Sequence, residues 1–300
     1  MNTEFKLRGI IPALVTPFST TGRVDEESLR EIVQFQLRHK VHGLFPCGTT
    51  GMGPAMQPEE RKRVAEIVVD EVRHRIPVIV QVGASDPSVN VELARHAEKI
   101  GAEAVASLTP FYYHPDEAAI IEHFERLSQA TNLPLLVYNI PSNTGINVNA
   151  KLLQKLSGIP NVVGIKDSSR DFSQLVDYLQ VVPDGFNVIN GTDSYHFSAF
   201  CAGIHAAVSA TSNAFPDLFV EMYEAYRSKD LEKGRSLQLK INAIRVATSQ
   251  PQITPHLEAL KMRGVRSGLV RPPLRSMTSA EITALRIAIG QIVPEIQLSA

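Results

Sequence analysis

The chain has 300 residues, of which 44% are hydrophobic and 20% are charged, and its formal net charge is −1. A chain of this length and composition can bury a core without disulfides, and the small net charge argues against a nucleic-acid or membrane-surface partner. The two cysteines, Cys47 and Cys201, lie far apart in the sequence, as is typical of a reduced intracellular protein. With no signal-peptide core and no apolar run of transmembrane length, we expect a cytoplasmic protein.

Short apolar runs alternate with amphipathic helical segments through the first 230 residues. Helical patterns are clearest over 25–40, which has an acidic first turn and basic residues at its end, and over 58–75, where Pro58 suits a first turn. The apolar runs suit parallel strands that are covered on both faces. They are 9–15, 43–47, 77–83, 104–108, 134–139, 161–167, 186–190 and 205–210.

Eight strands that alternate with helices predict an α/β fold, a closed (β/α)8 TIM barrel. An open doubly wound sheet is the alternative, although no G-x-G-x-x-G motif follows the first strand. Residues 231–300 contain no strand-like run. We therefore expect a catalytic barrel over residues 1–230 and a C-terminal helical extension over 231–300 that packs on the barrel.

Catalytic residues of such a barrel lie at the C-terminal ends of its strands. The residues that follow the eight runs include one lysine, Lys166, with tyrosines and several hydroxyl side chains. The histidines show no metal-ligand spacing, so no metal site is expected. The glycine-rich stretch GTTGMGPAM (48–56) lacks the lysine of a P-loop, which argues against nucleotide binding.

Lys166 ends the run VVGIK, so its stem emerges from an apolar strand. Burial disfavours the charged form of a lysine and makes a neutral, nucleophilic amine available. Attack of that amine on a ketone gives a Schiff base, which draws electrons from the neighbouring carbon–carbon bond. The alternative is a strand-end lysine that pairs with Asp167 and keeps its ammonium group in solvent.

Tyr138 ends the preceding predicted strand and therefore lies beside Lys166 in a barrel. Its phenol can relay protons if hydroxyls such as those of Thr49 and Thr50 assist it. The N–H groups and hydroxyls of the turn Gly48–Gly51 would form a small anion-binding concavity. The alternatives are a buried tyrosine bonded to the backbone and an ordinary turn between a strand and a helix.

Four motifs follow one another along the chain: GTTG (48–51), TPFYY (109–113), YNIPSNTG (138–145) and GIKDSS (164–169). Together they resemble the dihydrodipicolinate synthase/N-acetylneuraminate lyase family of class I pyruvate-dependent aldolases. The resemblance extends over essentially the whole chain. It implies small-molecule substrates, pyruvate with an aldehyde or the corresponding 2-keto acid, and no metal or organic cofactor.

The resemblance also implies roles for individual residues. Lys166 matches the Schiff-base residue and Tyr138 the general acid/base of the family. Thr49 matches a relay hydroxyl, and Thr50 the partner of the pyruvate carboxylate.

Further matches concern the pocket and the assembly. Tyr112 matches a tyrosine that family members insert into a neighbouring subunit's relay, which implies tight dimers and usually a homotetramer. Val208 falls where a backbone carbonyl lines the pyruvate pocket, and Gly191 follows the seventh run at the same rim.

Asn143 departs from the pattern of dihydrodipicolinate synthases. Their motif Y-N-x-P-x-R-T-G has an arginine at this place, which binds the carboxylate of aspartate semialdehyde. An amide cannot form that bidentate, charge-assisted pair, a loss of about 1.5–3 kcal/mol per bond. Met52 also replaces a usual acidic residue, and GTTGMGPAM is more similar to the GTTGLGPAL of 2-keto-3-deoxygluconate aldolases. GIKDSSRD and RPPL (271–274) point the same way.

Ser168, Asp193 and Ser209 match places where sugar-acid lyases hold a polyol tail, although each also suits a cap or a turn. We therefore expect a lyase that cleaves or forms a bond between pyruvate and a neutral, hydroxylated aldehyde, with a 2-keto-3-deoxy sugar acid as the substrate. The alternatives are a dihydrodipicolinate synthase or a keto-deoxy sugar acid dehydratase on the same scaffold. A non-catalytic sugar-acid-binding protein is a more distant one.

Overall fold

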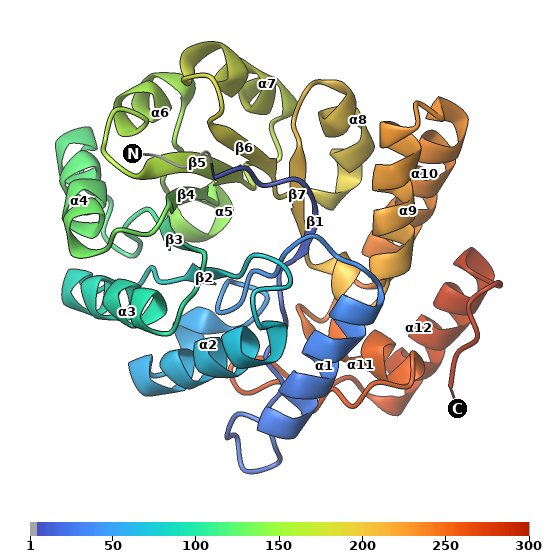
Figure 1. Cartoon of the computed structure of the whole chain (residues 1–300). Coiled ribbons are helices and arrows are strands. Elements are labelled where there is room, and N and C mark those ends of the chain that lie inside the picture. Colours follow the sequence, from blue (N-terminus) through green and yellow to red (C-terminus); the bar gives the residue numbers. More distant parts are fainter. Residues whose placement is uncertain (1–4, 300) are drawn as a thin grey trace.

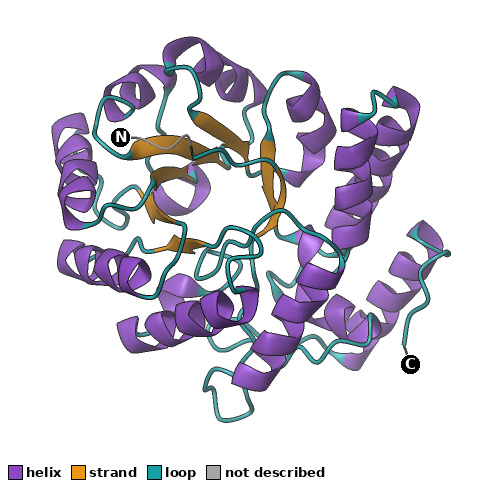
Figure 2. Cartoon of the chain, viewed as in Figure 1, coloured by secondary structure: helices purple, strands orange, loops and turns teal. Residues whose placement is uncertain are grey.

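The structure, a computed structural model, describes residues 5–299. Within these residues the strands form one parallel seven-stranded sheet that curls into a ring, with helices around its outside (Figure 1 and Figure 2). The strand order is β1-β7-β6-β5-β4-β3-β2. The strands are β1 (Gly9–Pro12), β2 (Ile79–Gln81), β3 (Ala104–Leu108), β4 (Leu135–Asn139), β5 (Val162–Asp167), β6 (Asn187–Asn190) and β7 (Ala206–Ser209).

The strand order runs in sequence and brings β1 beside β7. A doubly wound sheet would reverse its order at a switch point, so the curled, TIM-barrel-like arrangement is confirmed and the open alternative is wrong. Seven of the eight apolar runs contain the strands.

The run 43–47, predicted as a strand, lies between β1 and β2 but is not one. It forms only isolated parallel bridges, from Phe45 to Ala13 and from Leu44 to Val78. The run still hydrogen-bonds to both neighbours, from Leu44 N to Pro77 O (2.9 Å) and from Phe45 N to Pro12 O (3.0 Å), but Pro46 has no N–H to continue the pattern.

The helices surround the sheet, and many begin after a polar residue that caps them. Asp25 accepts a hydrogen bond from Ser28 N (3.1 Å), and Thr278 and Glu281 form a capping box. The helices are α1 (Glu26–Arg38), α2 (Pro58–Val72), α3 (Pro87–Lys99), α4 (Glu117–Ala130), α5 (Pro141–Thr144), α6 (Ala150–Leu156), α7 (Phe172–Val181), α8 (His196–Cys201), α9 (Pro216–Arg227), α10 (Leu231–Ala247), α11 (Thr254–Met262) and α12 (Ser279–Ile292), with short 3-10 turns η1 (Gly53–Ala55), η2 (Asp193–Tyr195) and η3 (Thr211–Asn213).

Apolar side chains pack on both faces of the sheet, as the two-sided runs predicted. The inner face of the ring has its own cluster, which includes Phe45, Leu136, Tyr138 and Val208. The larger cluster fills the space between the strands and the surrounding helices. Successive strand residues point to opposite faces, so this alternation decides which polar side chains enter the ring.

Helices α10–α12 pack on the rest of the fold, with α10 against α8, α9 and η2 and α11 against η3. Arg271, in the loop between α11 and α12, binds Glu60 through two hydrogen bonds of 2.7 and 2.8 Å, and its guanidinium carbon lies 4.2 Å from the Phe18 ring centroid. The C-terminal segment is therefore tied to the start of the chain.

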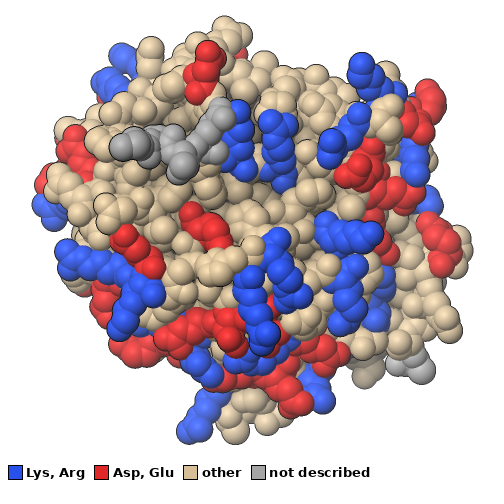
Figure 3. All heavy atoms as spheres, viewed as in Figure 1, with Lys and Arg blue, Asp and Glu red and all other residues tan. Residues whose placement is uncertain are grey.

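The surface carries charges of both signs, and Figure 3 shows Lys and Arg side chains interspersed with Asp and Glu on one face. Among residues 5–299, no helix has the length and apolar character needed to cross a bilayer. Within the same range, no three His, Cys, Asp or Glu side chains gather in a way that would hold a metal ion.

Candidate active site

Tyr138 and Lys166 lie side by side inside the ring. They are register partners on β4 and β5, so their side chains share one face of the sheet. Lys166 is only 3% exposed, and its Nζ lies 3.8 Å from the centroid of the Tyr138 ring and 4.2 Å from that of Phe45. Burial lowers the pKa of the Lys166 amine below its ordinary value, and contact with Tyr138 offsets only part of that effect. The site therefore favours the neutral amine.

Asp167 points to the opposite face of the sheet, behind the ring. Its carboxylate accepts hydrogen bonds from Asn139 Nδ2 (2.7 Å), Ser169 Oγ (2.6 Å) and Tyr178 Oη (3.3 Å). Lys166 forms no ion pair with it in the described part of the chain. The alternative of a solvated Lys166–Asp167 pair is therefore wrong.

Tyr138 contacts a hydroxyl of the glycine-rich turn. Its Oη lies 3.2 Å from Thr49 Oγ1, with either oxygen able to donate. The turn holds Thr49 in place because Gly53 fits where no other residue can, since a Cβ there would lie 1.8 Å from the Cys47 carbonyl oxygen. Met52 adopts a left-handed φ of 54° to reach this approach. The close approach at Gly53 and the left-handed backbone at Met52 therefore fix the conformation of the turn that carries Thr49.

A cavity of about 540 Å³ opens at the C-terminal ends of the strands. It brings together nine of the residues that the sequence singled out. They are Thr49, Thr50, Tyr138, Asn143, Lys166, Ser168, Gly191, Asp193 and Val208.

Asp193 is a buried, ionised carboxylate in this cavity. His196 Nε2 lies 3.0 Å from its Oδ1, and Thr211 N donates to its Oδ2 at 3.3 Å. Burial by itself raises the pKa of Asp193, but its interactions with His196, led by the hydrogen bond, outweigh burial and lower the pKa to about 2. Asn190 Nδ2 donates to His196 Nδ1 (2.7 Å), which leaves Nε2 as the nitrogen that donates to Asp193.

Three predicted site residues lie outside the cavity lining. Gly48 is buried beneath the turn, and its carbonyl accepts a hydrogen bond from Gly53 N (3.0 Å). Ser209 is buried, and its Oγ accepts from Ser212 N (3.0 Å). Tyr112 is 82% exposed and packs edge-to-face on Tyr113 with ring centroids 5.1 Å apart. Their predicted roles stay predictions.

The cavity also has lining residues that sequence reasoning missed. They include Arg170, Arg245, Thr248 and His256. Arg170 closely follows β5, so reading a few residues further past the strand end would have found it. Arg245 and His256 lie on α10 and α11, where no strand-end rule applies.

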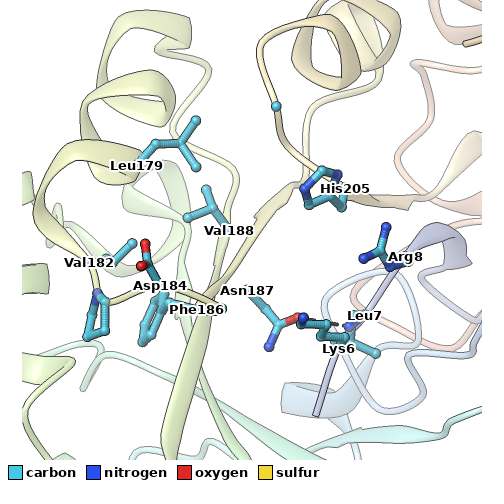
Figure 4. A pocket seen from close by; sticks show the side chains of 13 residues that line it. Lys6, Leu7, Arg8, Leu179, Val182, Asp184, Phe186, Asn187, Val188 and His205 are labelled. Carbon is cyan, nitrogen blue, oxygen red and sulfur yellow. Dashed lines mark hydrogen bonds between the residues drawn. The ribbon is translucent and has the colours of Figure 1, made fainter. Parts of the chain in front are cut away.

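A second, smaller cavity of about 290 Å³ opens at the N-terminal ends of β6 and β7. Figure 4 shows Arg8, Asp184, Phe186, Asn187 and His205 among its lining side chains. The Asn187 side chain accepts from Leu7 N (2.8 Å), so the walls of this cavity are joined to the N-terminal segment.

The curled sheet, with a buried lysine and tyrosine at its C-terminal end, defines a lyase of the class I aldolase type. The dihydrodipicolinate synthetase family model matches residues 6–292, and the chain belongs to this family. It is an enzyme of that family, a pyruvate-dependent lyase, as the motifs predicted.

Relatives and solved structures agree with this assignment. The 4-hydroxy-tetrahydrodipicolinate synthase of Methanopyrus kandleri is 35% identical over 274 residues, which cover 90% of this chain and 91% of that protein. An uncharacterized DapA-like lyase of Halobacterium salinarum is 36% identical, with 95% and 94% covered. The sialic acid aldolase of Ruminococcus gnavus, solved as a catalytic lysine mutant, has a TM-score of 0.93 at 26% identity, with 98% of each chain covered.

Proposed function

We propose that the protein is a 2-keto-3-deoxy sugar acid aldolase, which cleaves its substrate to pyruvate and a hydroxylated aldehyde or runs the reverse reaction. The observation that carries this proposal is Asn143 in the cavity lining, where an arginine would bind aspartate semialdehyde. Polar groups that suit hydroxyls line the same cavity, among them Ser168 and the carboxylate of Asp193. The names of the synthase relatives favour the second candidate, condensation of pyruvate with aspartate semialdehyde.

In the proposed cleavage, the neutral Lys166 amine attacks the ketone of the substrate, and water leaves as the imine forms. Tyr138 gives its phenol proton to the departing water, and the phenolate so formed, with Thr49 as its relay, takes the proton of the C4 hydroxyl while the C3–C4 bond breaks. The aldehyde leaves, and the electron pair of the broken bond moves into an enamine. Protonation of the enamine at C3 and hydrolysis of the imine release pyruvate and restore Lys166.

Binding of the pyruvate part is assigned to the turn that contains Thr50. Its hydroxyl and the neighbouring N–H groups would hold the carboxylate, while Val208 and Gly191 supply backbone at the same rim. Asp193 stays ionised at neutral pH, so it can accept hydrogen bonds from substrate hydroxyls. Ser168 lines the side of the pocket that would hold the polyol. Ser209 lies behind that side and supports it through its hydrogen bond with Ser212 N.

The remaining proposals concern assembly. We propose a cytoplasmic homotetramer of tight dimers, in which Tyr112 reaches the relay of a neighbouring subunit. The support is the exposure of Tyr112 and its packing on the equally exposed Tyr113. Sedimentation and the activity of Tyr112→Phe test the assembly.

We also propose that the run 43–47 closes an eight-membered barrel over residues 1–230, with residues 231–300 as its extension.

Trapping the Schiff base tests the mechanism. Sodium borohydride added with pyruvate should fix a three-carbon adduct on Lys166, located by mass spectrometry of a digest. Lys155, which pairs with Glu117 on the surface, serves as the internal control and should remain unmodified. An unmodified Lys166, or equal labelling of both lysines, would contradict the mechanism.

A substrate panel tests the choice of aldehyde. Pyruvate release from 2-keto-3-deoxygluconate and from N-acetylneuraminate is compared with the condensation of pyruvate and aspartate semialdehyde. We expect the highest kcat/KM with the keto-deoxy sugar acid and no loss of water from it. A strong preference for aspartate semialdehyde would establish the synthase, and loss of water would establish the dehydratase. Binding without turnover or adduct would support a non-catalytic protein.

A further inference from the structure

A stripe of polar side chains on α10 leads into the cavity. Gln238 Nε2 donates to the carbonyl of Asp193 (2.8 Å), and Asn242 Nδ2 donates to that of Ser194 (3.3 Å). Arg245 follows at the next helical spacing, so it lies on the same face of α10. The first two side chains fix the helix on η2 at the cavity wall, and Arg245 extends the stripe into the lining.

Arg245 is unusual because it has no partner within residues 5–299. No ion pair or hydrogen bond of its guanidinium is present there, and its Nε is buried without an acceptor. Arg263, by contrast, binds both carboxylate oxygens of Asp217 at 3.3 and 2.9 Å. A buried N–H without an acceptor is costly, and a guanidinium matches a carboxylate or phosphate in bidentate geometry. Arg245 is therefore shaped for an anion that enters from the cavity.

The charge balance of the cavity points in the same direction. Arg170, in the loop after β5, lines it together with Arg245 and has no ion pair within the described residues. Asp193 is the one carboxylate among the described lining residues, and it is already engaged by His196. Two guanidinium groups thus face a single, already paired carboxylate. A pocket with this balance favours a substrate with a second negative charge.

We propose that the substrate carries an anionic group, a carboxylate or a phosphate, at the end remote from its pyruvate part, and that Arg245 binds this group with Arg170 beside it. The proposal rests on the proposed lyase function and replaces the expected neutral aldehyde by a charged one, so that the substrate is a 2-keto-3-deoxy sugar acid with an anionic group at its far end. Asn143 stands where dihydrodipicolinate synthases have an arginine, so that wall of the pocket lacks a cation. Arg245 supplies a cation from α10 instead.

Turnover of three aldehydes with pyruvate tests this assignment and distinguishes the two anions. Glyceraldehyde is neutral, glyceraldehyde 3-phosphate carries a phosphate, and succinic semialdehyde carries a carboxylate. We expect at least one anionic aldehyde to exceed glyceraldehyde in kcat/KM by more than tenfold. Arg245→Met should reduce that preference by about 10–100-fold and leave the glyceraldehyde rate within threefold.

Two further variants separate recognition from folding. Arg245→Lys keeps the positive charge but not the bidentate geometry of the guanidinium. It should therefore retain part of the preference for the anionic aldehyde that Arg245→Met loses. Arg235→Met, on the same helix but exposed and paired with Glu232, should change neither rate. A wild-type preference for glyceraldehyde, or an equal loss with all aldehydes in Arg245→Met, would overturn the proposal.

A binding measurement keeps this result separate from the lyase reaction. Calorimetry with Lys166→Ala, which cannot form a Schiff base, compares 2-oxoadipate with 2-oxohexanoate, which lacks the second carboxylate. We expect 2-oxoadipate to bind at least tenfold more tightly, and Arg245→Met in the same background to erase the difference. Equal affinities of the two acids would overturn the anion site even if the lyase reaction is confirmed. A difference without turnover would leave the site standing and the proposed function refuted.

Discussion

The two ends of the sheet use polar side chains in different ways. At the N-terminal end, the side chain of Asn187 accepts a hydrogen bond from Leu7 N and donates to the carbonyls of Phe5 and Val163. Its amide therefore stabilises the fold. At the C-terminal end, buried polar atoms such as the Nε of Arg245 and the Nδ1 of His256 have no partner among the described residues.

The difference matters because buried polar groups are normally paired. At the N-terminal end, the Asn187 amide is fully paired within the fold, whereas the C-terminal end keeps groups that a ligand would satisfy. This contrast supports the proposal that the substrate binds in the cavity at Lys166 and not in the cavity of Figure 4. The following experiments would sharpen or break this distinction.

Removing the Tyr138 hydroxyl should have the largest effect. We expect Tyr138→Phe to lower kcat by about 10²–10⁴-fold, because the proton transfer loses its general acid/base. Trapping with pyruvate and borohydride should still modify Lys166, though more slowly. Tyr113→Phe, a change at an exposed tyrosine, is the matched control and should retain activity. A loss below tenfold in Tyr138→Phe would remove Tyr138 from the mechanism.

Acid should destabilise the fold through two buried histidines. Burial lowers the pKa values of His256 and His123 from the ordinary 6.5 to about 4. Between these values the unfolded chain binds more protons than the folded one, so stability is lost as the pH falls from 6.5 to 4. The loss approaches about 3 kcal/mol per histidine.

Urea unfolding at pH 7, 5 and 4 measures this loss. His256→Gln and His123→Gln should each reduce the difference in unfolding free energy between pH 7 and pH 4. His114→Gln, at an exposed histidine without an ion pair among the described residues, should leave that difference unchanged. If neither buried variant changes the difference, burial does not shift these two pKa values.

Removing the Thr49 hydroxyl should have a smaller effect than removing that of Tyr138. Thr49→Val keeps the shape of the side chain but breaks its 3.2 Å contact with the phenol. We expect kcat to fall by about 10–100-fold, below the loss for the tyrosine because a water can replace a relay. Thr49→Ser should keep most of the activity, and an equally low rate in both variants would indicate a packing role.

A change at the other end of the sheet should have the smallest effect. Arg8 lines the N-terminal cavity, and we expect Arg8→Ala to leave kcat/KM within twofold because the reacting groups lie at the opposite ends of the strands. Steady-state kinetics of Arg8→Ala and Arg245→Met, measured side by side, compare the effects of the two ends on kcat/KM. A loss of more than fivefold in Arg8→Ala would mean that the two ends are coupled.

The sequence predicted most of the fold because the strands are buried on both faces. The run 104–108 coincides with β3, and the order of the runs was enough to bring Tyr138 beside Lys166. The run 43–47 was predicted as a regular strand but forms only isolated bridges, because apolar character does not reveal that Pro46 lacks an N–H for the ladder.

The candidate site was predicted less completely. Arg245 was missed because its place depends on how α10 packs against η2, and no local pattern encodes that packing. The role of Tyr112 stays a prediction because its side chain is exposed and lies outside the cavity lining.

The pairing of β1 with β7 has a consequence for how the protein is made. Asn213, just beyond β7, binds the carbonyl of Ala13 and the N–H of Val15 across 200 and 198 residues. A ribosome releases β1 first, yet the partner of that strand emerges only after two thirds of the chain has been translated. Contacts this distant slow folding and leave a strand edge unpaired. During synthesis, the edge of β1 that will pair with β7 therefore stays unpaired until β7 has been made.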